Sequence, residues 1–113
     1  MEHISQPHAQ KFENATVTSW EYEMKNAALN VAPISIRGRY PANGFTSNLE
    51  SDAIVHVVDG SGIIGLKDGS SVVLAKNDQL HLAVGDTYYF EGNLEVIYAA
   101  SPIWTPEQTE HTD

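Results

Sequence analysis

Residues 53–100 form a train of short apolar runs separated by tight-turn signals, and this spacing constrains the fold most. The turn signals are DGSG (59–62), KDG (67–69), KND (76–78), VGD (84–86) and EGN (91–93). Apart from the short acidic tail TPEQTEH, no window carries the apolar stripe of an amphipathic helix. Many short strands joined by Gly and Asp turns predict an all-β sandwich or barrel.

Two further β-runs precede this train, TVTSWEYEM (16–24) and NVAPISIRGRY (30–40), and PANG (41–44) follows as a strong turn signal. In the second run, Ile34 and Ile36 lie on one face and Arg37 and Arg39 on the other. The isoleucine face is therefore expected to be the core face.

The chain divides into three expected segments. Residues 1–15 are polar and aperiodic, which predicts a flexible N-terminal arm, and they do not resemble a signal peptide. Residues 16–104 carry the β-domain, and residues 105–113 form a short C-terminal tail in which Thr105 would cap a turn begun by Pro106.

The charge balance excludes several classes of partner. The 113-residue chain has a formal net charge of −9 and only 6 Lys and Arg residues. Nucleic acids and anionic membranes are therefore not expected partners, because phosphate binding needs clustered basic side chains. The chain has no cysteine, which removes disulfides and zinc–sulfur sites and fits a cytoplasmic location.

Two stretches resemble the motifs of the cupin superfamily. VHVVDGSG (55–62) is similar to the end of the first cupin motif, and NDQLHLAVGDTYYFEGN (77–93) is similar to the second. The order RYP, GSG, YYFEGN and SPIWTPEQ also resembles small single-domain bacterial cupins of unassigned function. Over residues 30–104 the resemblance implies a cupin jelly-roll barrel of two antiparallel sheets, and a homodimer.

The same motifs carry metal ligands in metal-binding cupins. Thr46 and Asn48 stand at the two histidine positions of the first motif, Ala53 at its glutamate, and Tyr88 at the histidine of the second. None of these is a usual ligand of iron, manganese, nickel or zinc. No metal and no cofactor are therefore expected, and strand alternation predicts that His56 and His81 face outward.

The resemblance places a set of aromatic and polar residues at the barrel mouth, which are Tyr40, Thr46, Asn48, Tyr88 and Phe90. An apolar lining with a few convergent polar groups is typical of a ligand pocket. The favoured hypothesis is a metal-independent small-molecule-binding or regulatory cupin of unknown ligand. Arg39 would pair with a carboxylate ligand only if its strand face turned inward.

Two alternatives stay open. The first is a cupin-fold isomerase, epimerase or lyase acting on a small sugar or organic acid, with Tyr88 as the acid and an inward Glu50 or Asp52 as the base. The second is a dimeric scaffold with a filled barrel, in which Trp20 and Tyr22 anchor the interface. Trp104 would either close a barrel mouth or contact a second subunit. Binding is favoured over catalysis, because the sequence offers no clear base.

Overall fold

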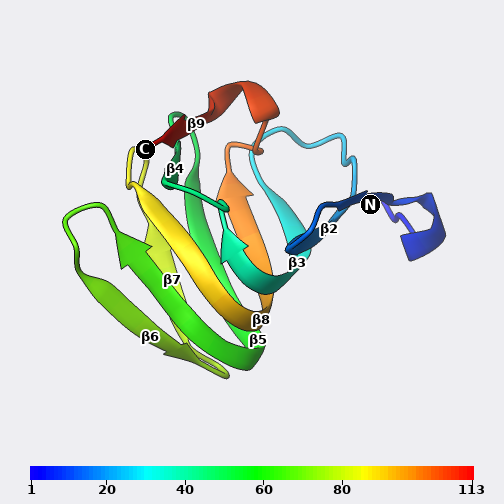
Figure 1. The fold of residues 1–113 in the computed structure, drawn as a ribbon. Helices are drawn as coiled ribbons and strands as arrows, with labels where there is room; N and C mark the ends of the chain where they lie inside the picture. The colour runs from blue at the N-terminus through cyan, green and yellow to red at the C-terminus, as the bar shows by residue number, and fades with distance from the viewer.

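A computed structural model describes residues 1–113 and shows nine strands with two short 3-10 helices (Figure 1). The strands are β1 (Gln10–Glu13), β2 (Val17–Glu21), β3 (Asn30–Tyr40), β4 (Phe45–Asn48), β5 (Asp52–Leu66), β6 (Ser71–Ala75), β7 (Gln79–Leu82), β8 (Tyr88–Ser101) and β9 (Thr109–Thr112). The helices are η1 (Gln6–His8) and η2 (Pro106–Gln108), and no helix of the protein is long and apolar enough to cross a membrane.

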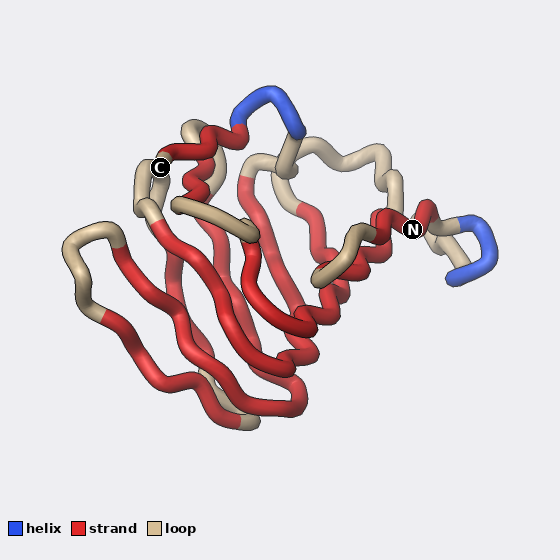
Figure 2. The backbone as a smooth tube through the Cα atoms, viewed as in Figure 1, coloured by secondary structure: helices blue, strands red, loops and turns tan.

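The strands form one curled antiparallel sheet, which confirms the predicted all-β barrel (Figure 2). The long strand β8 lies in the middle, paired along its length with β3 on one side and β5 on the other. β5 also pairs with β6 and β7, while β2 and β1 extend the sheet beyond β3. β5 and β8 therefore hold the two walls of the barrel together in a single hydrogen-bonded sheet.

Two of the five predicted turns are bends inside long strands. DGSG lies within β5 and EGN within β8, whereas KDG, KND and VGD do connect strands. Gly62 of β5 pairs with Gly92 of β8, and a Cβ on Gly92 would lie 2.6 Å from the Gly62 Cα. Gly92 also has a φ of 141°. Glycine lets the two strands bend over each other here, so both continue where the turn signals predicted a reversal.

Strand alternation places the core inside this curl. Val55, Val57 and Leu94 are 0% exposed, and Ile36 is also buried, as predicted for the isoleucine face. His56 lies between the two buried valines in sequence and points to the outer face, where its Nδ1 is 3.2 Å from Gln79 Oε1. The buried side chains of β3, β5, β6, β7 and β8 thus form one hydrophobic core.

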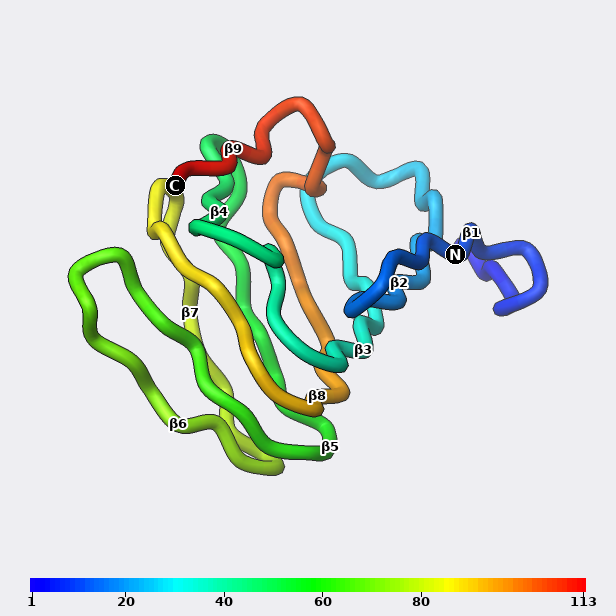
Figure 3. Tube along the Cα trace, viewed as in Figure 1, coloured from blue at the N-terminus to red at the C-terminus, as the bar shows by residue number.

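Both chain ends contribute strands to the sheet (Figure 3). β1 pairs with β2, and β9 pairs with β4, so residues within the expected arm and tail belong to the sheet. Thr105 precedes η2 but makes no side-chain capping bond. Gln108 instead holds the C-terminal segment, because its buried Oε1 accepts hydrogen bonds from the Glu50 and Ser51 backbone N–H groups.

Candidate functional site

A cavity of about 400 Å³ opens inside the barrel and is lined by 21 residues, 13 of them hydrophobic. The lining comes from β1, β2, β3, β4 and β8 and from the segment that leads into β9. All five residues expected at the barrel mouth line this cavity, namely Tyr40, Thr46, Asn48, Tyr88 and Phe90. The structure therefore brings together the whole set that the motif spacing singled out.

Strand register explains why four of these side chains converge. Tyr40, at the end of β3, pairs with Phe90, and Thr46 of β4 pairs with Tyr88. The rings of Tyr88 and Phe90 meet edge to face with centroids 5.5 Å apart. Tyr88 is only 5% exposed and Thr46 only 2%, so this part of the cavity is shielded from solvent.

Tyr98 joins the site although sequence reasoning missed it. It lies ten residues after Tyr88 on β8, which in a straight strand would separate the two residues by about 33 Å. Because β8 bends at Gly92, the two hydroxyls come close enough to affect each other's ionisation. The Tyr98 hydroxyl also accepts a hydrogen bond from Asn48 Nδ2.

The three tyrosines of the cavity are neutral hydrogen-bonding groups at physiological pH. Burial raises the pKa of Tyr88 well above its usual value, and the neighbouring Tyr98 adds to this effect. Burial also raises the pKa of Tyr98 and of Tyr40. Beside them, Thr46 Oγ1 is buried and makes no hydrogen bond of normal geometry, although it lies close enough to the Tyr40 hydroxyl to lower that group's pKa. The cluster can therefore donate hydrogen bonds to a hydroxyl or carbonyl oxygen of a ligand.

Glu21 is a second cavity residue that sequence reasoning missed. Val17, Ser19 and Glu21 alternate along β2 on the face toward Ile34 and Ile36 of β3. Ser19 Oγ donates a 2.7 Å hydrogen bond to Glu21 Oε1. TVTSWEYEM carries this alternation, but its largest side chains, Trp20 and Tyr22, lie on the opposite face and favour that face as the apolar one.

The carboxylates proposed as catalytic bases do not line the cavity. Glu50 is exposed, and Asp52 lies on the outside, where its Oδ1 is 3.1 Å from His81 Nε2. The side chains of Asp52 and His81 are 58% and 55% exposed. The expectation of an inward Glu50 or Asp52 is therefore wrong, because Asp52 alternates with the buried Ala53 on β5.

The two arginines of β3 also face away from the cavity. Arg37 forms an ion pair with Glu95 on the outer face. Arg39 stacks 4.0 Å from the centroid of the Tyr89 ring and donates a 2.7 Å hydrogen bond to the Pro41 carbonyl. Neither is placed to bind a carboxylate ligand inside the barrel.

The donor set does not fit the metal centre of a metal-binding cupin. Thr46, Asn48 and Tyr88 offer neutral oxygen and amide groups, and Ala53 offers none. No group of three His, Cys, Asp or Glu side chains converges anywhere in the protein. No chemical step is therefore assigned to a metal.

Trp104 lies at the cavity mouth. It lines the cavity together with Pro106 and Thr109, and its Nε1 donates a 2.8 Å hydrogen bond to Thr109 Oγ1. Trp20 lies outside the cavity lining, with Lys11 Nζ 5.7 Å from its ring centroid. Trp104 therefore folds back over the barrel, and its contact with a second subunit stays a prediction.

Comparisons with solved structures identify the fold. No family model matches the chain, and no curated protein matches it. A variant of PAC13 from Streptomyces, solved with uridine, is 15% identical with a TM-score of 0.88, covering 99% of this chain and 90% of its own. Pac13 is described as a unique nucleoside dehydratase.

Two further solved structures agree. Ectoine synthase from P. lautus is 12% identical with a TM-score of 0.75, over 100% of this chain and 91% of its own. KdgF from Halomonas sp. is 20% identical with a TM-score of 0.68, over 89% and 94% of the two chains. The chain thus has the cupin fold. At these identities the similarity shows the fold alone.

Proposed function

We propose that this protein binds a small organic molecule in its barrel cavity without the help of a metal. The observation that carries the proposal is the convergence of Tyr40, Asn48, Tyr88 and Tyr98 on one largely apolar cavity of about 400 Å³. Ligand pockets span roughly 300–1,000 Å³ and combine apolar walls with a few polar groups. A cavity of this size also argues against the filled-barrel scaffold.

The polar groups of the cavity indicate which hydrogen-bonding groups such a ligand carries. Three phenols, the Asn48 amide and the unpartnered Thr46 hydroxyl lie inside an apolar wall. Buried hydrogen-bonding groups are costly when left unpaired, so a ligand with hydroxyl or carbonyl oxygens gains by satisfying them. A phosphate or nucleic acid does not fit, because no Lys, Arg or His lines the cavity.

A thermal-shift screen of small hydroxylated and carbonyl compounds, uridine among them, tests the proposal in buffer with and without EDTA. At least one compound is expected to raise Tm equally in both buffers, because a ligand that binds only the native state stabilises it. The shift should shrink in Tyr88→Phe and persist in Tyr89→Phe, since Tyr89 lies outside the cavity lining. A shift that needs added metal, or one lost equally in both variants, would argue against the proposal.

A lyase is the second candidate, and the inward Glu21 carboxylate favours it. Glu21 would accept the proton next to a carbonyl group while the tyrosine cluster holds the enolate oxygen. Glu21 would then return that proton to the departing β-hydroxyl, so that water leaves and a carbon–carbon double bond forms. The fold is shared with a protein described as a nucleoside dehydratase. Assays with β-hydroxy carbonyl compounds would show an unsaturated product that Glu21→Gln abolishes. If no compound of the series is turned over, the lyase candidate is wrong and ligand binding is the function that remains proposed.

A homodimer stays a proposal as well. Trp20 and Tyr22 are half-buried near the N-terminal edge of the sheet and would supply contacts. Light scattering would give twice the mass of the 12.4 kDa chain if the proposal holds.

A further inference from the structure

The cavity contains one charged group, and that group is negative. Glu21 carries the single carboxylate among the 21 lining residues, and no Lys, Arg or His joins it. We infer that the cavity selects a small molecule with a positively charged nitrogen, an amine or a quaternary ammonium. The inference rests on the proposed binding function and names the ligand class of that site.

Glu21 lacks a cationic partner within the chain. Its Oε1 accepts a hydrogen bond from Ser19 Oγ, and it takes part in none of the three ion pairs of the protein. A half-buried carboxylate loses solvation, and one hydroxyl donor replaces only part of it. A ligand cation would supply the missing counter-charge.

The six basic residues are all placed elsewhere. Lys11 lies against Trp20 and Glu13, Arg37 pairs with Glu95, and Arg39 stacks on Tyr89. The remaining three, Lys25, Lys67 and Lys76, are exposed and do not line the cavity. With a net charge of −9, the field of the whole protein attracts cations and repels anions.

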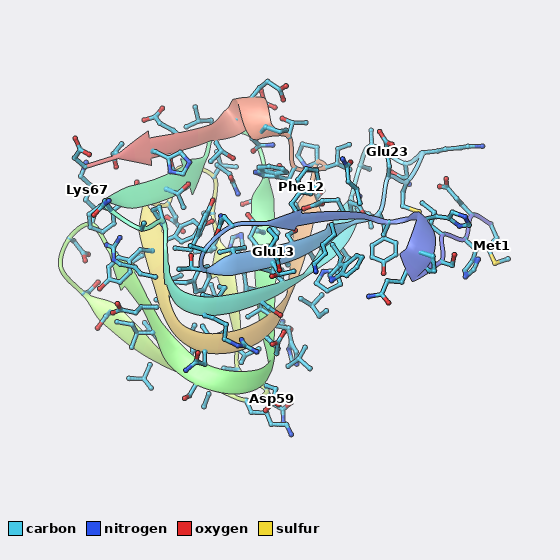
Figure 4. The ribbon with its side chains drawn as sticks, turned by 45° about the vertical axis from the view of Figure 1, so that its right-hand side comes forward. Met1, Phe12, Glu13, Glu23, Asp59 and Lys67 are labelled. Atoms are coloured by element: carbon cyan, nitrogen blue, oxygen red, sulfur yellow. The ribbon has the colours of Figure 1, made fainter.

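Aromatic rings line the same cavity as this carboxylate. The lining includes Phe12, Tyr40, Tyr88, Phe90, Tyr98 and Trp104. Phe12 of β1 pairs with Ser19 of β2, which puts it diagonally beside Glu21 on the inner face. Phe12, labelled on β1 in Figure 4, lines the cavity together with Trp104. Aromatic faces attract organic cations, most strongly where water is displaced.

The two ends of the cavity therefore differ in chemistry. Phe12 and Trp104 are partly exposed and lie with Glu21 at the mouth, whereas Tyr88, Asn48 and Thr46 are buried. A cationic nitrogen fits the mouth and an oxygen fits the buried end. Amino alcohols and their N-methylated forms carry both groups.

Choline and its neutral isostere 3,3-dimethyl-1-butanol test the inference, because they share shape and hydroxyl group and differ in charge. The readout is the pair of indole N–H signals in NMR spectra, since Trp104 lines the cavity and Trp20 does not. Choline should shift the Trp104 signal saturably and bind at least about tenfold more tightly than the isostere. The Trp20 signal should stay in place.

Glu21→Gln should remove the preference for choline and leave binding of the isostere intact, which also shows that the variant is folded. Glu23→Gln is the matched control, because Glu23 is exposed outside the cavity lining and the variant should keep the preference (Figure 4). Equal or tighter binding of the isostere to the parent protein would overturn the inference and leave the proposed function standing. A preference that survives Glu21→Gln would overturn it too. If neither probe moves the Trp104 signal, the inference is wrong, and the proposed function is judged by its own screen.

Discussion

Tyr88 stands where metal-binding cupins carry a histidine, and the residues around it explain what this change does to the site. Its phenol is buried beside Tyr98 and Tyr40, and desolvation raises the pKa of all three groups. Each hydroxyl therefore keeps its proton and acts as a neutral hydrogen-bonding group. At this position the cavity therefore presents a neutral hydroxyl group.

The raised tyrosine pKa values predict a loss of stability in base. Because the folded values lie above the unfolded value of about 10, the unfolded chain releases these protons first as pH rises. The stabilisation is fully present below about pH 10 and is lost as pH rises beyond it. Urea unfolding at a series of pH values from neutral to strongly alkaline should show this decline. Tyr88→Phe should flatten it, and Tyr89→Phe should not; an identical decline in all three proteins would contradict the assignment.

At the scale of elements, the bend in β5 and β8 makes the site. Gly62 and Gly92 face each other where the strands fold over, and this curvature carries Tyr98 back toward Tyr88. Without the bend, the inner face of β8 would present its tyrosines at opposite ends of a flat sheet. The cavity is thus a consequence of strand curvature rather than of loop placement.

Gly92→Ala is expected to lower the free energy of unfolding by at least about 2 kcal/mol. The new Cβ would meet the Gly62 Cα and the Ser61 carbonyl oxygen, each 2.6 Å away, at a φ of 141°. Gly69→Ala is the control, because Gly69 also has a positive φ of 93° but no atom within 4 Å of the added Cβ. Chemical denaturation measures the free energy of unfolding of both variants. Equal decreases in the two variants would show that the close approach of the strands at Gly92 does not add to the cost of the substitution.

Gln108 is the second element-scale contact with a measurable effect, because it ties the C-terminal segment to the start of β5. Gln108→Ala leaves the buried Ser51 N–H and the partly buried Glu50 N–H without their acceptor, so a loss of about 1–3 kcal/mol is expected. Hydrogen exchange of the β9 amides should accelerate more than that of the β8 amides. Glu107→Ala, at an exposed neighbour, should change neither quantity. Unchanged exchange in β9 would mean that Gln108 does not anchor the segment.

The sequence predicted the strand faces well where they depend on local alternation. Ile36 is inward and Arg37 outward, and VGD does separate β7 from β8. The bends at DGSG and EGN were not predictable, because glycine permits a turn and a bent strand equally. Tyr98 was missed for the same reason, since its place in the site depends on that curvature.

At the scale of the whole molecule, an acidic exterior surrounds a cavity with a single carboxylate and no basic residue. The basic side chains are used in contacts with aromatic rings and acids outside the cavity, or are exposed. The interior is therefore suited to neutral or cationic organic ligands and not to anions. No group of three His, Cys, Asp or Glu side chains converges in the protein.

The most direct test of this account follows isoleucine methyl signals during titration with the tightest compound from the thermal screen, in the presence of EDTA. Ile34 and Ile36 line the cavity, whereas Ile54 lines a groove on the outside of the barrel beside His81. The account predicts saturable shifts at Ile34 and Ile36, none at Ile54, and the same affinity with and without EDTA. Shifts confined to Ile54, or binding that EDTA abolishes and added metal restores, would contradict it.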